Sequence, residues 1–327
     1  MSAVSTRTLD ALLEAPVVPS FTLIGYEARS RLFDWKPLDD YDLTDRTIVL
    51  TGGSSGLGYA AAEEFAKLGA TIVIVARDPD KTEHAVEQLK SDHGNDRISG
   101  ELADLSDLDQ VRGASERIGD SHPRIDALIH NAGALLPERR EAPDGTELTT
   151  QVMVAAPFLM TSLLLDQLRA ATPGRVITMS SGGMYTSGLT VSKLQMDEKS
   201  YNGAQQYARA KRAQVVLNEM WAAKLPRNEV VFHAMHPGWA DTPGVDAGIP
   251  GFGKVMGPLI RSPEQGADTM VWLAADSSIE ETTGAFWHDR AVRSTHKFKA
   301  TARTDTPARR EALWAWCEQH TSVSSHI

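Results

Sequence analysis

The chain has 327 residues, of which 42% are hydrophobic and 23% are charged, as in an ordinary folded protein that buries a core. Its net charge of −10 at pH 7, without a basic run, argues against nucleic acid or an anionic membrane as the main partner. The single cysteine, Cys317, excludes an intrachain disulfide, and no stretch is apolar for long enough to span a bilayer or to form a signal-peptide core. We therefore expect a soluble, cytoplasmic protein.

Residues 1–45 precede the first predicted strand and carry aromatic residues, among them Phe21 and Trp35. We expect this segment to be an extension that packs on the body as a brace rather than a functional arm. Residues 46–327 are expected to form a single domain, with a glycine- and proline-rich substrate loop at about 238–262 and a C-terminal helix.

From residue 47 onwards, short apolar runs alternate with helical patterns. Seven strands are predicted, at 47–50, 71–76, 97–101, 125–130, 175–179, 229–235 and 284–287. Helices are predicted at 57–68, 80–90, 105–118, 148–168 and 203–224. This alternation indicates an α/β fold of βαβ units, with a parallel, doubly wound sheet and right-handed crossovers.

A glycine-rich loop, Thr51-Gly-Gly-Ser-Ser-Gly-Leu-Gly58, joins the first strand to the first helix. Gly52 permits a tight turn, Gly56 lets the backbone approach a pyrophosphate, and Gly58 lets the helix pack closely. The free N–H groups at the start of the helix favour a bound phosphate, although an ordinary glycine-rich turn is the alternative. The expected cofactor contacts in this loop are Gly52, Ser54, Ser55, Gly56, Leu57 and Gly58.

The ends of the second and third strands carry the next candidates. Arg77 follows Ala76 where dinucleotide folds place an acid that binds the ribose hydroxyl. Because an arginine pairs with a 2′-phosphate that a carboxylate would repel, NADP is favoured over NAD as the cofactor. The alternative is a surface arginine paired with Asp78. Asp104 and Leu105 are expected at the adenine end of the cofactor. Asp104 could accept a hydrogen bond from the adenine amino group, cap the following helix, or do both.

Small residues follow two further strands and allow close approach of a cofactor. The fourth strand is closed by Asn131, Ala132 and Gly133, and the sixth by Pro237 and Gly238, with Thr242 four residues later. A proline–glycine turn with a nearby hydroxyl is suited to hold a nicotinamide carboxamide. Each of these patterns is weak evidence by itself.

A tyrosine and a lysine share one face of the helix predicted at 203–224, because Tyr207 and Lys211 lie four residues apart. A free tyrosine has a pKa of about 10 and is a poor base at neutral pH. A neighbouring ammonium and a cationic nicotinamide would favour the phenolate, so that Tyr207 exchanges a proton with an alcohol or carbonyl oxygen. Ser181 follows the fifth strand and is placed to hydrogen-bond that oxygen, although a turn serine is the alternative.

Taken in this order, the glycine loop, Asp104, Asn131-Ala-Gly133, Ser181, Tyr207-x3-Lys211 and Pro237-Gly238 resemble the short-chain dehydrogenase/reductase family over residues 46–290. The resemblance implies a seven-stranded Rossmann domain. It also implies roles for three residues: Tyr207 as acid and base, Lys211 as ribose holder and pKa tuner, and Ser181 as substrate anchor. Segments such as Arg175–Met184 and His236–Gly244 look like the branch called dehydrogenase/reductase member 12, near the retinol dehydrogenase-like group.

Met153 departs from the family pattern, which has an asparagine at this place. The family asparagine lies where the backbone bends and a water joins the lysine to bulk solvent. We therefore expect an altered proton relay, with either slow turnover or a water that binds the backbone without the amide. A methionine that simply fills a core gap is the structural alternative.

These patterns predict an NADP(H)-dependent oxidoreductase that moves hydride between the nicotinamide and a secondary alcohol or carbonyl. Its partner would be a small, apolar molecule in a pocket lined by Met184, Tyr185, Trp239 and the 243–257 loop. No metal site is predicted, and a homodimer is left open. The alternative function is a catalytically weak NADP(H)-binding redox sensor, which Met153 favours and the intact Ser181, Tyr207 and Lys211 oppose.

Overall fold

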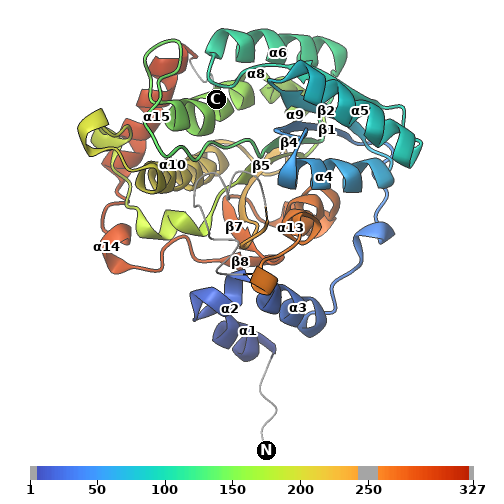
Figure 1. The fold of residues 1–327 in the computed structure, drawn as a ribbon, viewed down its shortest axis with the longest axis horizontal. Helices are drawn as coiled ribbons and strands as arrows, with labels where there is room; N and C mark the ends of the chain where they lie inside the picture. The colour runs from blue at the N-terminus through green and yellow to red at the C-terminus, as the bar shows by residue number, and fades with distance from the viewer. Residues whose placement is uncertain (1–5, 242–256, 324–327) are drawn as a thin grey trace, which may run out of the picture.

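The computed structural model describes residues 6–241 and 257–323, and its centre is one eight-stranded sheet in the order β3-β2-β1-β4-β5-β6-β7-β8 (Figure 1). The strands are β1 (Thr47–Thr51), β2 (Thr71–Ala76), β3 (Ile98–Leu102), β4 (Ala127–His130), β5 (Gly174–Met179), β6 (Val230–His236), β7 (Ala285–His288) and β8 (Ala291–Arg293). Strands β1 to β7 pair in parallel, which confirms the predicted Rossmann-like fold. The sheet has one strand more than predicted, because β8 pairs with β7 in the antiparallel sense.

Helices cover both faces of the sheet, since each face buries its own cluster of apolar side chains. One face is covered by α4 (Gly56–Lys67), α5 (Pro79–His93) and α13 (Pro263–Ala275). The other is covered by α6 (Leu108–Ser121), α8 (Ala156–Leu163), α9 (Leu165–Arg169), α10 (Gly203–Lys224) and α15 (Pro307–Thr321). The central strands are buried on both faces, as their continuous apolar runs require.

The predicted helix at 148–168 is present, but its first part is wound differently. It begins as α7 (Leu148–Thr150), where the Glu147 carboxylate accepts the Thr149 and Thr150 N–H groups. A π-helical turn, η2 (Gln151–Ala155), follows before α8 and α9 continue the helix. The wider turn is centred on Met153, and such turns are frequent at functional sites.

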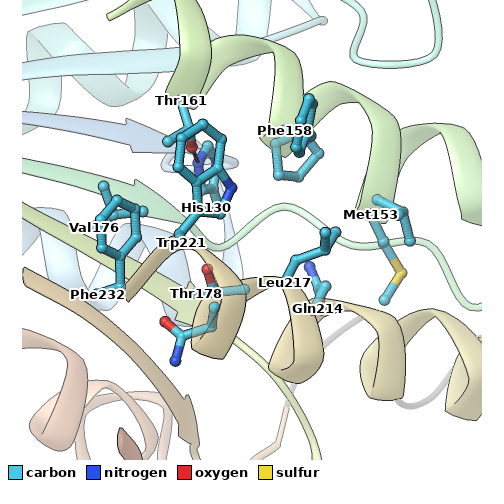
Figure 2. A pocket seen from close by; sticks show the side chains of 13 residues that line it. His130, Met153, Phe158, Thr161, Val176, Thr178, Gln214, Leu217, Trp221 and Phe232 are labelled. Carbon is cyan, nitrogen blue, oxygen red and sulfur yellow. Dashed lines mark hydrogen bonds between the residues drawn. The ribbon is translucent and has the colours of Figure 1, made fainter. Parts of the chain in front are cut away.

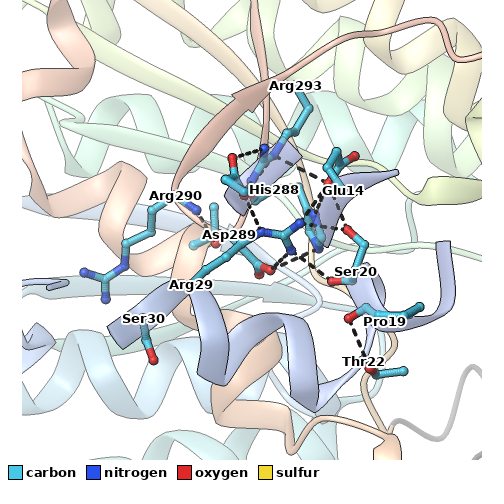
Figure 3. A network of polar contacts seen from close by, with 12 residues as sticks. Glu14, Pro19, Ser20, Thr22, Arg29, Ser30, His288, Asp289, Arg290 and Arg293 are labelled. Atoms are coloured by element: carbon cyan, nitrogen blue, oxygen red, sulfur yellow. Dashed lines mark hydrogen bonds and ion pairs between the residues drawn. The ribbon is translucent and has the colours of Figure 1, made fainter. Parts of the chain in front are cut away.

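The N-terminal segment folds as α1 (Thr6–Glu14), α2 (Val17–Phe21) and α3 (Leu23–Leu32), which lie beside β7 and β8 (Figure 1). Arg29 is fully buried there and forms ion pairs with Asp10, Glu14 and Asp289 (Figure 3). Asp289 lies in the β7–β8 turn and also pairs with Arg261. Residues of this extension are therefore part of the same buried network as the end of the sheet.

The remaining described elements are short. They are η1 (Leu38–Asp40), η3 (Gly182–Thr186), η4 (Val191–Lys193), η5 (Glu198–Ser200), η6 (Gly257–Leu259), η7 (Ser277–Glu281) and α14 (Lys299–Ala302). Most of the predicted substrate loop, including Thr242, lies outside the described residues. Within the described ranges, no helix is both long enough and apolar enough to cross a membrane.

Candidate active site

The residues singled out in the sequence follow six neighbouring strands at one edge of the sheet. Parallel strands present their carboxyl ends to the same side, and ligands of open α/β sheets bind there. In the order β3, β2, β1, β4, β5 and β6, the residues that follow these ends are Asp104, Arg77, Gly52, Asn131, Ser181 and Pro237. The fold therefore gathers along one edge residues that are far apart in the sequence.

The glycine turn after β1 cannot carry side chains at its critical positions. Gly52 and Gly56 have positive φ angles of 70° and 56°. A Cβ on Gly58 would lie 2.1 Å from the Gly52 carbonyl oxygen and 2.6 Å from Asn131 Nδ2. Gly58 thus allows the start of the helix to pack directly against the Gly52 carbonyl oxygen. Gly56 is needed for its positive φ as well as for the room that it leaves for a ligand.

The first turn of α4 is suited to hold a phosphate. Ser55 is the N-cap of this 12-residue helix, and no side chain caps its N–H groups. Ser55 is exposed and Ser54, Gly56 and Leu57 are only partly buried, so their polar groups face outward at the end of the helix. An uncapped N-terminus above a glycine turn fits the pyrophosphate of a dinucleotide.

Asn131 holds the glycine turn in place. Its Nδ2 donates to the Thr51 carbonyl oxygen at 3.0 Å and to that of Gly52 at 3.3 Å. The backbone N–H groups of Asn131 and Ala132 both donate to Thr51 Oγ1 at 3.1 Å. The sequence analysis missed Thr51, although a hydroxyl at the last position of the first strand was a signal for such a contact.

Arg77 is exposed at the end of β2. Its predicted alternative partner, Asp78, instead caps α5 and forms an ion pair with Lys81 at 3.5 Å between Nζ and Oδ2. In the part of the chain that the structure describes, the Arg77 side chain has no ion pair or hydrogen bond. Its guanidinium is therefore available to a ligand at this edge.

The predicted cap of the third crossover helix was misplaced. Helix α6 begins at Leu108, and Asp107 caps it by accepting the N–H groups of Asp109 and Gln110. Asp104 instead accepts from the Ser106 N–H and hydroxyl, at 2.9 Å and 2.8 Å, in a turn before the helix. Leu105 packs partly on the core cluster. The alternative role of Asp104 as a helix cap is therefore wrong, because a second aspartate lies closer to the helix.

Ser181, Tyr207 and Lys211 lie together between β5 and α10. The Ser181 hydroxyl oxygen accepts the Gly183 N–H at 3.2 Å, which fixes Oγ. Lys211 Nζ donates to the Met179 carbonyl oxygen and lies 5.3 Å from the centre of the Tyr207 ring. The Ser180 hydroxyl donates to the Lys211 carbonyl oxygen at 3.2 Å and ties the helix to the strand end.

Burial dominates the acid–base properties of this group. It raises the pKa of Tyr207 to about 12, and a hydrogen bond with Ser181 opposes this shift. It lowers the pKa of Lys211 to about 7. The protein side chains alone therefore do not give Tyr207 the lowered pKa that the sequence led us to expect. Desolvation disfavours the phenolate more than the hydrogen bond from Ser181 favours it.

Met153 is fully buried in the core cluster and its sulfur lies against the Asn131–Gly133 turn. Met153 Sδ accepts the Ala134 N–H at 3.4 Å. The bend in the helix is retained as the π turn although no asparagine is there. These contacts favour the structural alternative, in which the methionine packs this position.

Gly238 and Arg261 form one unit at the end of β6. Gly238 has a φ of 77°, and a Cβ there would lie 2.3 Å from the Arg261 guanidinium carbon. Arg261 donates to the Pro237 carbonyl oxygen at 3.2 Å and is held by Asp289. The sequence analysis missed Arg261, because its partners are distant in the chain.

Two residues expected to line the substrate pocket are buried instead. Met184 and Tyr185 belong to a small core cluster, and the Tyr185 hydroxyl donates to the Ser294 carbonyl oxygen at 2.8 Å. Phe21 of the extension lies over Gly182, where an added Cβ would be 2.5 Å from its ring. Phe21 also accepts the Trp239 N–H through its carbonyl oxygen at 2.7 Å. The extension thus contacts the segments that follow both β5 and β6.

Comparisons with known proteins agree with this geometry. The family model described as short chain dehydrogenase matches residues 46–248. Human dehydrogenase/reductase SDR family member 12 is 39% identical over 301 residues, covering 91% of this chain and 93% of that protein. This match takes in part of the N-terminal extension, since residues 46–327 alone are less than 91% of the chain.

More distant relatives share the main domain. Human retinol dehydrogenase 13 is 30% identical and covers 74% of this chain and 75% of its own length. An uncharacterized protein from Mycobacterium paratuberculosis has a crystal structure with a TM-score of 0.70 and 25% identity, covering 90% of this chain and 99% of its own. L-sorbose reductase from Gluconobacter frateurii, complexed with NADPH and L-sorbose, has a TM-score of 0.60 at 24% identity, covering 76% and 96% of the two chains.

Proposed function

Because this chain belongs to the short-chain dehydrogenase/reductase family, whose members are oxidoreductases that act on CH–OH or carbonyl groups, we propose that it transfers hydride between NADP(H) and a secondary alcohol or carbonyl of an apolar substrate. The observation that carries this proposal is the grouping of Ser181, Tyr207 and Lys211 at the sheet edge that holds the glycine turn.

In this proposal Tyr207 exchanges a proton with the substrate oxygen. Ser181 Oγ accepts the Gly183 N–H, so the Ser181 hydroxyl can donate its hydrogen to the Tyr207 oxygen or, when substrate is bound, to the substrate oxygen. Lys211 is buried beside the Tyr207 ring. In this position it binds the ribose and influences the pKa of the tyrosine. The nicotinamide, when bound, supplies or accepts the hydride, and its positive charge in the oxidised form favours the phenolate.

The cofactor is held along the edge in this proposal. The uncapped start of α4 would hold the pyrophosphate, and the exposed Arg77 would pair with the 2′-phosphate. Asp104 and Leu105 remain assigned to the adenine end, Ala132 and Gly133 to the middle of the cofactor, and Pro237, Gly238 and Thr242 to the nicotinamide.

The apolar character of the substrate is supported by the relative named retinol dehydrogenase 13, since retinol is a largely apolar alcohol. The sensor alternative loses its main support, because Met153 is part of the packed core and does not mark a broken site. A cytoplasmic location stays a prediction of the sequence, and a homodimer stays open.

The cofactor assignment is tested by fluorescence titration with NADPH and NADH. NADPH should bind more tightly, and Arg77→Ala should weaken NADPH binding by about 1–3 kcal/mol, the scale of a charge-assisted hydrogen bond, while NADH changes little. Arg31→Ala is the matched control, because Arg31 is 79% exposed and, within the described residues, its ion pair is with Glu27 on its own helix. Equal affinities in the parent protein would contradict the NADP assignment, and NADPH oxidation with a panel of apolar ketones tests the reaction itself.

A further inference from the structure

A stripe of polar side chains runs along one face of α10, beginning at the catalytic pair. Tyr207, Lys211, Gln214 and Asn218 follow one another at intervals of four, three and four residues. Residues at such intervals lie on one face of a helix, with neighbouring Cβ atoms about 5–6 Å apart. All but Tyr207 are buried, so the stripe leads from the reacting group into the interior between α10 and the sheet.

The lower part of this stripe opens on a cavity between α8, α10 and β5. Figure 2 shows Met153, Thr178 and Gln214 around this space, with His130 and Thr161 on its far wall. The space that the centres of water molecules can occupy is about 30 Å³. One water needs about 10–15 Å³ of such space, so the cavity has room for about two.

The two amides that line this cavity have no protein partner. Gln214 and Asn218 are each 3% exposed. Within the described residues, neither the nitrogen nor the oxygen of either amide makes a hydrogen bond. Four buried polar atoms without partners are costly, and ordered water is the usual way in which such groups are satisfied.

We propose that Gln214 and Asn218 hold ordered water behind Lys211, and that this water returns protons to the Lys211–Tyr207 pair between turnovers. Each transfer moves one proton from solvent through water to Lys211 Nζ, and only O–H and N–H bonds form and break. Gln214 and Asn218 are then positioning residues that act through the water. The lining residue Pro157 is partly exposed, so the cavity lies closest to solvent on this side.

This assignment explains how Met153 is tolerated. The methionine lines the same cavity from the π turn and offers no amide. Gln214 and Asn218 supply the amides from the opposite helix, so water is held from α10 instead of from η2. The relay part of the proposal rests on the proposed oxidoreductase function, whereas the presence of water does not.

The test uses the full chain with Gln214→Met and Asn218→Leu, which keep side-chain size and remove the amides. Turnover with an accepted carbonyl should fall about tenfold, a modest part of the 10²–10⁴-fold that positioned proton transfer contributes. The solvent isotope effect should rise, the isotope effect from deuterated NADPH should shrink, and melting temperature should be nearly unchanged. Leu217→Met is the control, because it lines the same cavity without a polar atom and should leave all values as in the parent.

A crystal structure of the parent gives an independent measurement. Ordered water bonded to both amides is expected, and a cavity without water overturns the proposal whether or not any substrate is found. The proposal is also overturned if both variants show the same isotope effects as the parent. If the parent reduces no carbonyl of the panel, the proposed function fails by itself, and the water density still decides whether Gln214 and Asn218 hold water.

Discussion

At the scale of single residues, burial sets the acid–base properties of the site. The pKa of Tyr207 is raised to about 12, and that of Lys211 is lowered to about 7, because desolvation disfavours the charged form of each side chain. Near pH 7 the phenol is therefore protonated, and the lysine is close to the midpoint between its charged and neutral forms. In this state Tyr207 is ready to donate a proton, which is what carbonyl reduction requires.

Tyr207→Phe keeps the ring and removes this donor. Reduction of an accepted carbonyl should fall by at least about a hundredfold, while NADPH binding stays nearly intact. Steady-state kinetics and fluorescence titration measure the two effects. Tyr201→Phe is the control, because the Tyr201 hydroxyl donates to the Leu136 carbonyl oxygen and to Glu147 at 3.4 Å rather than to Ser181 or Lys211. A Tyr207 variant that keeps most of its turnover would show that the hydroxyl is structural.

Met153→Asn tests the departure from the family pattern. Met153 is fully buried and its sulfur accepts the Ala134 N–H, so an amide of smaller volume should lower stability by about 1–3 kcal/mol. Turnover should not rise, because protons already arrive through the amides of α10. Melting temperature and solvent isotope effect are measured together. A faster variant with a smaller isotope effect would show instead that proton supply limits the parent.

Residue types at strand ends were predictable, but their contacts were not. Arg77, Ser181 and Tyr207 were recognised because their chemistry follows from side-chain type and position on an element. The roles of Thr51, Phe21 and Arg261 depend on segments that meet only in the folded chain. No local pattern in the sequence carries that information.

At the scale of elements, the strand–helix alternation was sufficient to predict the sheet and its two helical layers. Strand β8 was missed because it has three residues and its turn uses Asp289 and Arg290 at positive φ, without the glycine that marks such turns. The π turn was missed because its residues, apart from Gln151, are apolar and fit the helical period. Helix α6 was started too early because two aspartates precede it.

The contact between β1 and α4 gives a prediction at this scale. Gly58→Ala places a Cβ 2.1 Å from the Gly52 carbonyl oxygen, so the turn and the helix must move apart. Stability should fall by about 1–3 kcal/mol, the usual cost of overpacking, and NADPH binding should weaken. Gly113→Ala on α6 is the control, since its Cβ meets only the flexible end of Arg117 and it should gain about 0.5–1 kcal/mol. Urea unfolding and NADPH titration of both variants check the prediction, which an unchanged Gly58 variant would contradict.

At the scale of the whole molecule, buried charges join the N-terminal extension to the end of the sheet (Figure 3). Arg29 pairs with Asp10, Glu14 and Asp289, and Arg261 pairs with Asp289 from the opposite side. Burial alone would raise the pKa of Asp289, but His288, Arg261 and Arg29 hold it well below its usual range. The charged pairs also fix Arg261 against the Pro237 carbonyl oxygen at the nicotinamide end of the proposed site.

Arg29→Ala should lower the free energy of unfolding by about 3–5 kcal/mol at pH 7, because it leaves buried carboxylates with fewer partners. Asp10, Glu14 and Asp289 have pKa values lowered in the folded state, so their contribution is complete above their ordinary values of 3.8 and 4.5. This contribution to stability is lost as pH falls below that range. The difference in unfolding free energy between Arg29→Ala and the parent should therefore shrink at low pH. Urea unfolding at pH 7 and pH 3.5 measures this, with Arg31→Ala expected within about 0.5 kcal/mol of the parent at both. A difference that stays constant with pH would contradict the assignment to these ion pairs.

The Arg29–Asp289 pair also sets an order of events on the ribosome. The two residues are 260 positions apart, so the arginine leaves the ribosome well before its aspartate is made. At about 5–20 residues per second, the interval between them is roughly 13–50 s. During that time Arg29 can pair with Asp10, Glu14 and Ser20 of its own segment, but not yet with Asp289. The turn after β6 therefore acquires this support only after Asp289 is made, and we expect a chain that stalls before Asp289 to leave the nicotinamide end of the proposed site unbraced.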